Sequence, residues 1–330
     1  MDAVNFPIDI VLPWVDGSDI DWQEKKKKYV PEKKDDAQRY RDLGTLKYVL
    51  RSIEKFAPWV NHIFLITDHQ RPAWLADSSK ISVVDHQSFI PAEYLPTFNS
   101  NVIELNAWKI KGLSEHFILF NDDTLLIKPT RPTDFFTAEG QPMDNAAQFV
   151  LSPADSFAHI AVNNIVLINN KFSKRNWLKN NFLKAFSLKN GFVLNVYSVL
   201  LSVLPRLTRF YDPHIPLSYT RANFANAEAT FSEEFVRTFM TKTRDLNNIS
   251  HWVVRYSQLM SGDFSVRSSK FGLYLNIQEV EKFSQVLKKK YPKVIVLNDT
   301  IANDRELTLA NETMAKLETY LPEKSSYEQL

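Results

Sequence analysis

Short apolar runs alternate with helical patterns along most of this chain, and this alternation restricts the fold more than any other feature. Five runs have the length and composition of buried strands: Ile8–Val15, His62–Thr67, Ile81–Val84, His116–Phe120 and Val294–Leu297. Helical patterns predict helices over residues 43–57, 102–110, 233–240, 248–260, 278–290 and 306–320. Strands that alternate with helices are typical of an α/β fold with a mostly parallel sheet core flanked by helices. We predict a single domain of this class over residues 1–330.

Acidic residues follow four of the apolar runs. The runs end in PWVDGSD (Asp16 and Asp19), FLITD (Asp68), ILFNDD (Asp122 and Asp123) and VIVLND (Asp299). In open α/β sheets a ligand lies beyond the carboxyl ends of the strands, and carboxylates there suit a divalent cation that holds phosphates. Aspartate also begins turns and caps helices, so one such strand end would decide nothing. Four together favour a site, most strongly at Asp122 and Asp123.

The composition excludes several classes of site. The chain has no cysteine, which rules out disulfides, thiolate zinc sites and a cysteine nucleophile. Its 7 glycines are too far apart for a dinucleotide fingerprint or a P-loop. The 40 Lys and Arg residues nearly balance the 38 Asp and Glu residues, so we expect no nucleic-acid partner. We see no signal peptide and no membrane-spanning run, and therefore expect a cytoplasmic protein.

The segment 171–210 differs from the rest of the chain because it contains basic residues and no acidic residue. Its basic residues are interleaved with aromatic and aliphatic side chains, and we expect a helical insertion here. Basic helices with one apolar face lie at membrane interfaces. An ordinary helical subdomain, with its apolar face in the core and its lysines in solvent, would have the same composition. The sequence leaves both interpretations open.

Four ordered blocks make the chain resemble a known family. The blocks are DIVLPWVDGSD (9–19); RYRDLGTLKYVLRSIEKFAPWVNHIFLITD (39–68) with LPTFNSNVIELNAWKIKGLSEHFILFNDD (95–123); DPHIPL (212–217) with the segment around Arg244; and VLNDT (296–300). In these blocks the chain is similar to the Stealth family of hexose-1-phosphate transferases, which includes bacterial capsular polysaccharide phosphotransferases. The resemblance covers nearly the whole chain.

The resemblance implies a glycosyltransferase-A-like core and a phosphotransferase reaction. Members of the family use a nucleotide sugar, usually a UDP-sugar such as UDP-GlcNAc. An acceptor hydroxyl attacks the phosphorus that carries the sugar, hexose-1-phosphate is transferred, and UMP leaves. The expected acceptor is a lipid-linked saccharide of capsule or exopolysaccharide synthesis, which would bring the protein to the inner face of the membrane as a peripheral protein.

The resemblance also assigns roles to individual residues. It implies four catalytic residues, which are Glu104, Asp123, His214 and Arg244. It implies Mg²⁺ or Mn²⁺ held by Asp122, Asp123 and Asp299. The implied substrate-binding residues are Asp16, Gly17, Asp19, Arg39, Arg41, Asn99, Ser100, Asn101 and Asn298. An imidazole can take a proton from the acceptor hydroxyl or give one to the leaving phosphate, and a planar guanidinium suits a phosphate in transit. The other histidines considered, at 62, 69, 86 and 251, lack metal-ligand spacing and are predicted to be structural.

Two other functions stay open at this point. A metal-dependent glycosyltransferase would use the same donor and a similar fold, but it would attack the anomeric carbon and release UDP. A non-catalytic saccharide-binding protein at the membrane surface would account for the many aromatic side chains and the basic segment 171–210. The acidic residues, together with His214 and Arg244, argue against this last alternative.

Overall fold

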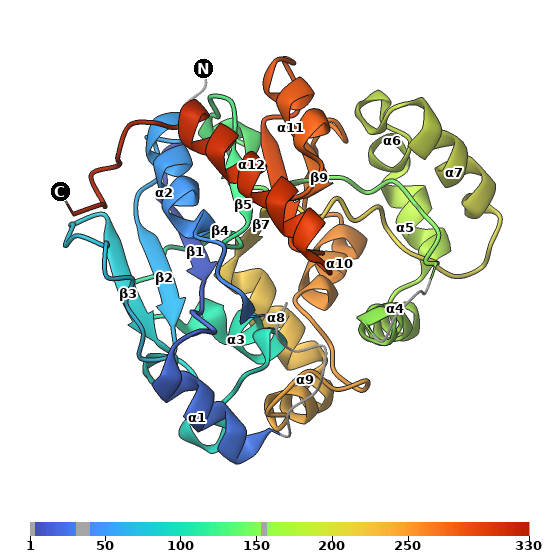
Figure 1. The fold of residues 1–330 in the computed structure, drawn as a ribbon. Coiled ribbons are helices and arrows are strands. Elements are labelled where there is room, and N and C mark those ends of the chain that lie inside the picture. Colours follow the sequence, from blue (N-terminus) through green and yellow to red (C-terminus); the bar gives the residue numbers. More distant parts are fainter. Residues whose placement is uncertain (1–3, 31–39, 153–156, 330) are drawn as a thin grey trace.

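The computed structural model describes residues 4–30, 40–152 and 157–329, and its centre is a five-stranded sheet. The strands are β1 (Ile8–Pro13), β2 (Ile63–Thr67), β3 (Ile81–Asp85), β4 (His116–Leu119) and β7 (Leu217–Thr220). Their order is β3-β2-β1-β4-β7, and the first four are parallel, while β7 pairs with β4 in antiparallel orientation. Figure 1 shows helices around this sheet. The predicted α/β fold with a mostly parallel sheet is confirmed.

Two smaller sheets complete the strands. The first consists of β5 (Thr124–Leu126), β10 (Val294–Asn298) and β9 (Gly272–Asn276), in the order β5-β10-β9. The second is the pair β6 (Met143–Asp144) and β8 (Ser265–Val266). The apolar run at Val294 is therefore a buried strand, as predicted, but it lies in a separate sheet. Only a few residues separate β4 from β5, so the segment that carries Asp122 and Asp123 connects the two larger sheets.

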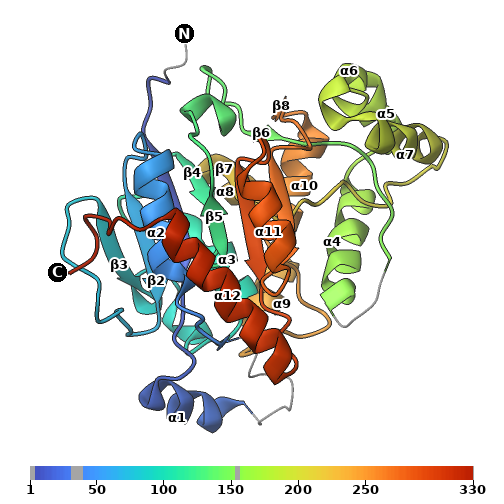
Figure 2. The same ribbon diagram turned by 45° about the horizontal axis from the view of Figure 1, so that its top comes forward.

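Successive side chains of a strand point to opposite faces of the sheet. Both faces of the central sheet are buried, because a separate hydrophobic core covers each one. Ile8, Ile10 and Leu12 of β1 belong to one hydrophobic core, and Val11 belongs to another. The first core includes α2 (Thr45–Phe56), α11 (Val280–Leu287) and α12 (Asp304–Tyr320). The second includes α3 (Ser100–Asn106), α8 (Arg221–Thr230), α9 (Ser232–Phe239) and α10 (Trp252–Ser261). Figure 2 shows α2 and α12 on one side of the central strands.

Most of the predicted helices are present with boundaries close to those expected. The pattern over residues 43–57 is α2, and those over 278–290 and 306–320 are α11 and α12. The pattern over residues 102–110 corresponds to α3 and a following 3-10 turn (Ala107–Lys109). Three of the longer helices were not predicted, namely α1 (Ile20–Tyr29), α4 (Phe157–Lys171) and α8 (Arg221–Thr230).

Residues 171–210 form a helical lobe at one side of the molecule. It contains α5 (Lys174–Asn180), α6 (Phe182–Ala185) and α7 (Phe192–Ser202). Figures 1 and 2 both show α6 and α7 beyond the sheets, on the same side as α4. Within the described part of the chain, no helix combines the length and apolar character that crossing a bilayer requires.

Candidate active site

The central sheet has a switch in strand order between β1 and β4. From β1 the chain proceeds to β2 and β3 on one side and then returns to place β4 on the other. Loops that leave two such strands diverge, and a crevice opens between them at the carboxyl edge of the sheet. The loop after β1 carries Asp16 and Gly17, and the loop after β4 carries Asp122 and Asp123. The topology therefore brings two of the predicted groups to one place.

The carboxylates at this edge are crowded and partly buried. Burial raises the pKa of Asp122 to about 8, and the negative charges of Asp123 and Asp42 contribute in the same direction. Burial also raises the pKa of Asp123 to about 7. The pKa of Asp42 is raised as well, mainly by burial and in part by Asp16. Shifts of this direction indicate carboxylates whose charge is not compensated by a positive group among the described residues.

A divalent cation would supply this missing charge. Mg²⁺ is commonly held by one or two protein carboxylates together with substrate phosphates, so the pair Asp122 and Asp123 fits such an ion. The predicted third ligand, Asp299, has other partners. Its Oδ2 lies 3.4 Å from Nη1 of Arg41, and its Oδ1 accepts a hydrogen bond from the Ile301 amide. Among the described residues, Asp122, Asp123 and Asp299 do not form a compact three-ligand group.

A compact group of three potential ligands does occur elsewhere, at the ends of β2 and β3. Ligand atoms of Asp68, His69 and Asp85 lie within 4.8 Å of one another. The backbone amide and Nδ1 of His69 both contact Oδ2 of Asp85, at 2.7 and 2.9 Å, and Nζ of Lys25 lies 2.6 Å from Oδ1 of Asp68. Because Lys25 already supplies a positive charge here, Asp122 and Asp123 are better suited to a cation.

Glu104 lies on α3 and faces a different set of groups. Burial raises its pKa to about 7, and the positive charge of Arg244 opposes part of this shift. Its Oε2 lies 3.7 Å from Nε2 of His251, the residue that precedes α10. Nδ1 of His251 lies 2.8 Å from the hydroxyl of Tyr219, and burial lowers the pKa of His251 to about 3. His251 is therefore neutral at neutral pH and contacts a predicted catalytic residue, a position that the sequence did not indicate.

The start of α3 is tied to the loop that carries Arg244. Nη2 and Nε of Arg244 donate hydrogen bonds to Oγ of Ser100, at 2.7 and 3.2 Å. The buried amide of Asn99 donates to Oγ1 of Thr241 and to Oδ1 of Asn248, at 2.8 and 2.7 Å. Asn99 therefore joins two segments, which fixes Glu104 relative to Arg244.

Asn101 differs from its neighbour Asn99. Its Nδ2 is buried and has no hydrogen-bond partner among the described residues. A buried amide nitrogen without an acceptor is costly, and such groups occur where a ligand or water completes the bonding. A bound substrate could accept this hydrogen bond, so the predicted role of Asn101 in substrate binding stays a prediction that its buried amide fits.

His214 lies between the acids and a pocket. Its backbone has a φ of 50°, the left-handed region that non-glycine residues seldom adopt. Its ring meets that of Tyr274 on β9 edge to face, with 5.3 Å between the centroids. Burial raises the pKa of Tyr274 to about 12, and the charge of Asp123 adds to this shift. Tyr274 thus contacts His214 and lies near enough to Asp123 for the charge of that carboxylate to affect it.

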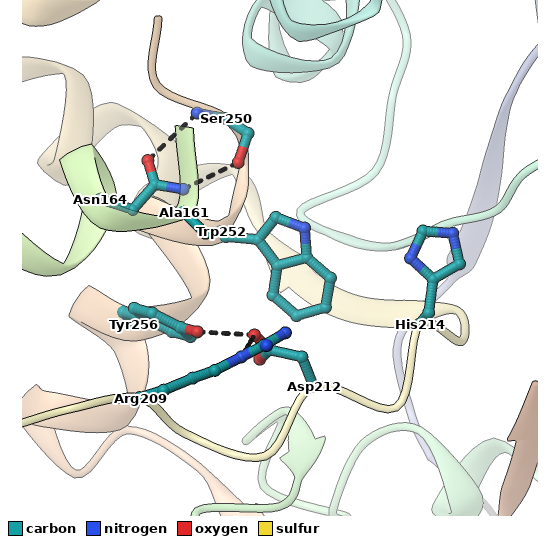
Figure 3. A pocket seen from close by; sticks show the side chains of 8 residues that line it. All are labelled: Ala161, Asn164, Arg209, Asp212, His214, Ser250, Trp252 and Tyr256. Carbon is teal, nitrogen blue, oxygen red and sulfur yellow. Dashed lines mark hydrogen bonds and ion pairs between the residues drawn. The ribbon is translucent and has the colours of Figure 1, made fainter. Parts of the chain in front are cut away.

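The pocket beside His214 is lined by aromatic and polar side chains. It has a volume of about 80 Å³, and its lining is Ala161, Asn164, Arg209, Asp212, His214, Ser250, Trp252 and Tyr256. Figure 3 shows the Asp212 carboxylate beside the Tyr256 hydroxyl and Arg209. The hydroxyl of Tyr256 and Nε of Arg209 each donate to Oδ2 of Asp212 at 2.7 Å. An aromatic face next to a few fixed polar groups is typical of a binding site for a small polar ligand.

The loop after β1 is tightly packed. The amide of Gly17 donates to the carbonyl of Tyr40 at 3.0 Å, and a Cβ at position 17 would lie 2.1 Å from that oxygen. Glycine is therefore required here by the close approach of another backbone. The carboxylate of Asp16 accepts hydrogen bonds from Ser18, and that of Asp19 accepts from the Trp22 amide and caps α1.

The remaining predicted residues are placed as follows. Asn298 ends β10, and its carbonyl accepts a hydrogen bond from the Ile277 amide. Arg39 lies outside the described residues. None of these contacts tests binding or catalysis, so all of the residue roles stay predictions. Asp42 and Tyr274, which the sequence did not indicate, and His251, which was predicted to be structural, lie close to predicted site residues.

Comparisons with known proteins identify the family to which this chain is similar. Residues 39–144 match the family model of Stealth protein CR2, conserved region 2, and residues 6–34 match that of Stealth protein CR1, conserved region 1. The chain is 40% identical to the exopolysaccharide phosphotransferase cps2G of Lactiplantibacillus plantarum, over 98% of this chain and 96% of the relative. It is 38% identical to the capsular polysaccharide phosphotransferase WcwK of Streptococcus pneumoniae, over 97% and 98%. Among solved structures, the galactosyltransferase LgtC in complex with donor and acceptor sugar analogues covers 96% of this chain and 98% of its own, with a TM-score of 0.42 and 10% identity.

Proposed function

Because this chain belongs to the Stealth family, we propose that it is a transferase that moves a sugar-1-phosphate from a UDP-sugar, such as UDP-GlcNAc, to a saccharide hydroxyl. The product would be a phosphodiester of a capsular or extracellular polysaccharide, and UMP would be released. The named relatives support phosphoryl transfer. The observation that carries the proposal is the position of His214, between an aromatic-lined pocket and the carboxylates at the end of β4.

The donor would bind at the carboxyl edge of the central sheet. Asp122 and Asp123 would hold Mg²⁺ or Mn²⁺, which neutralises the charge of the diphosphate when bound. Asp16 and Gly17 follow β1 at this edge, and Arg41, which pairs with Asp299, would supply a positive charge to the donor phosphates. These residues would bind and orient the donor.

The acceptor saccharide would occupy the pocket, with Trp252 as an apolar surface and Asp212 or Asn164 as hydrogen-bond partners. His214 is exposed to solvent, yet desolvation by the surrounding protein lowers the pKa of its imidazole and the charge of Arg244 acts in the same direction, so the neutral ring can accept a proton. The acceptor oxygen would form a bond to the phosphorus that carries the sugar, while its proton passes to His214. The bond from that phosphorus to the bridging oxygen breaks, and UMP leaves with the electron pair. Arg244 lies close enough to influence the pKa of His214 and would face the phosphoryl oxygens.

Glu104 gives a prediction for the dependence of stability on pH. The folded-state pKa of Glu104 is about 7, above its ordinary value, so the folded protein binds this proton more tightly than the unfolded chain. Its contribution to stability is present at low pH and is lost as the pH rises through about 7. Between about pH 5 and about pH 8 the free energy of unfolding should fall by roughly 2 kcal/mol more in the unmodified protein than in Glu104→Gln.

Urea unfolding of both proteins in the presence of a chelator would measure this difference. Asp122 and Asp123 titrate in both proteins, so their contribution cancels in the comparison. Glu281→Gln, at an exposed position of α11, serves as the control and should leave the pH dependence unchanged. Equal pH dependence in Glu104→Gln and in the unmodified protein would contradict the assigned environment of Glu104.

A product assay tests the proposed reaction. The protein is incubated separately with UDP-GlcNAc, UDP-galactose and UDP-glucose, with Mg²⁺ or with a chelator, in the presence of a crude lipid-linked acceptor, and the nucleotides are then separated. UMP that forms only with the metal, with phosphorus retained on the acceptor, would support the proposal and identify the donor. Release of UDP would identify a glycosyltransferase. Saccharide binding without any nucleotide product would favour the non-catalytic alternative.

A further inference from the structure

The helical lobe exposes a large apolar surface. Of the 22 large hydrophobic side chains that are exposed among the described residues, 11 lie within residues 182–204. The exposed fraction reaches 93% for Leu188 and 84% for both Leu183 and Phe192. Isolated exposed hydrophobic residues are common on protein surfaces, but a concentration of this kind marks an interaction site. We call the surface formed by the exposed hydrophobic residues of 182–204 the apolar face of the lobe.

The lobe is anchored to the second hydrophobic core by the buried Trp177 of α5 and Ala185 of α6, whereas α7 contacts the rest of the protein through a polar residue. Ser198 is the buried residue of α7, and its hydroxyl accepts a hydrogen bond from the Gln148 amide at 2.9 Å. The amide of Asn145 donates to Oδ1 of the buried Asn190 at 3.0 Å. A surface helix usually directs its apolar side to the core and its polar side to water. In α7 this arrangement is reversed.

The charge of the lobe is entirely positive, because residues 171–210 contain 8 basic side chains and no acidic one. Two of the lysines are directed inward. Nζ of Lys174 donates to the carbonyl of Leu201, and Nζ of Lys184 donates to the carbonyls of Gly262 and Phe264. The expectation that the lysines of this segment are solvated is therefore wrong for Lys174 and Lys184.

A third basic residue, Arg209, pairs with Asp212 and lines the pocket, and the other five are at the surface. Lys171, Arg175, Lys179, Lys189 and Arg206 are exposed. Basic side chains next to exposed apolar ones complement a surface that combines hydrocarbon with negative charge.

We propose that the apolar face of the lobe inserts into the interface of an anionic lipid bilayer, with the exposed basic residues against the lipid headgroups. A second copy of the chain fits this face less well, because a symmetric contact would bring two positively charged lobes together. The 11 residues of α7 extend over roughly 16 Å, about half of a bilayer's hydrocarbon thickness, so the helix can lie in the interface but cannot cross it.

The position of the lobe connects this inference to the site. The chain leaves the lobe at residue 210, directly before Asp212 and His214, and α4 supplies Ala161 and Asn164 to the same pocket. Binding of the lobe to a bilayer would bring the pocket close to the surface at which a lipid-linked saccharide is presented. The inference goes beyond the proposed function and does not depend on it, because membrane binding is measured without turnover.

Vesicle flotation of the full chain tests the proposal. We expect the protein to float with vesicles of phosphatidylcholine and phosphatidylglycerol, to float weakly with phosphatidylcholine alone, and to be released by salt. Leu188→Ser/Phe192→Ser should weaken the partition about tenfold or more, since the strength of interfacial binding scales with buried apolar area. Arg175→Glu/Lys179→Glu should have an effect of similar size on the anionic vesicles alone.

Matched controls carry the same kinds of substitution, hydrophobic to serine and basic to glutamate, on other surfaces. Val236→Ser/Met240→Ser replaces exposed hydrophobic residues near α9, and Arg305→Glu/Lys316→Glu reverses exposed charges on α12. Both should float as the unmodified protein does. Absence of flotation, or flotation that is unaffected by Leu188→Ser/Phe192→Ser, would overturn the proposal. Dimers in solution that this same double variant disperses would assign the face to a second copy and would also overturn it. Because every one of these substitutions is at an exposed position, a loss of folding is not expected, and thermal unfolding verifies this.

Discussion

Asp123→Asn should lower the rate of sugar-phosphate transfer by roughly a thousandfold or more, without loss of stability. Asparagine preserves the shape of the side chain and the contact with the Thr124 hydroxyl, but it removes the negative charge. Within residues 4–30, 40–152 and 157–329 no positive group compensates this charge, and burial raises the pKa of Asp123 to about 7. The free energy of unfolding of the metal-free variant should therefore be equal to or greater than that of the unmodified protein.

UMP release at saturating donor, combined with urea unfolding in the presence of a chelator, would measure both quantities. A residue required only for the fold would lose activity and stability together, whereas Asp123 should lose activity alone. Asp77→Asn, at an almost fully exposed carboxylate paired with Arg71, is the control and should change neither quantity appreciably. Activity within tenfold of the unmodified protein in Asp123→Asn would show that the pair at the end of β4 does not carry the reaction.

Arg255→Met should cost about 3–5 kcal/mol of stability, the largest effect on folding that we expect from one substitution. Arg255 is completely buried. Its Nε and Nη2 donate to the Asp144 carboxylate at 2.7 and 2.9 Å, and its Nη1 contacts Asp212. Removing the guanidinium would leave the buried Asp144 carboxylate without its ion-pair partner, and Asp212, two residues before His214, would keep only Arg209.

Urea unfolding measures this cost, and two further variants establish its cause. Adding Asp144→Asn to Arg255→Met should recover part of the lost stability, because one uncompensated charge is removed. Lys282→Met breaks an exposed pair with Glu279 and should cost less than about 1 kcal/mol. A cost below about 1 kcal/mol for Arg255→Met would contradict the role assigned to the buried cluster.

Elements with a clear hydrophobic pattern could be predicted from the sequence, and others could not. The pattern of α2 is strong because buried residues such as Leu46, Val49 and Ile53 lie on one side of the helix. In α1, Trp22 is the buried residue and most other positions are exposed, so no apolar period marks the helix. In α7 the exposed side is the apolar one, and a hydrophobic pattern cannot distinguish a surface that faces lipid from one that faces a core.

The candidate site also contains residues that the sequence predicted and residues that it did not. Acidic residues at strand ends predicted the edge of the sheet at which Asp122 and Asp123 lie, because parallel strands end together. The structure adds Asp42, His251 and Tyr274, whose contacts depend on how loops return to the edge. Asp42 follows directly after Arg41 in one of the blocks that resemble the Stealth family, and this was the only signal for it in the sequence. Pairing of Asp299 with Arg41 also depends on a contact between distant segments.

The two hydrophobic cores allow different parts of this fold to change in sequence separately. The segment with Asp122 and Asp123 is anchored by Phe120 and Leu125, which belong to the core shared with α2 and α12. The pocket beside His214 is built on α4 and α10, whose buried residues belong to the other core. Substitutions in one core are largely independent in their effects from substitutions in the other. If the pocket binds the acceptor as proposed, substitutions that reshape it can accumulate in one core while Asp122 and Asp123 keep their positions on the other.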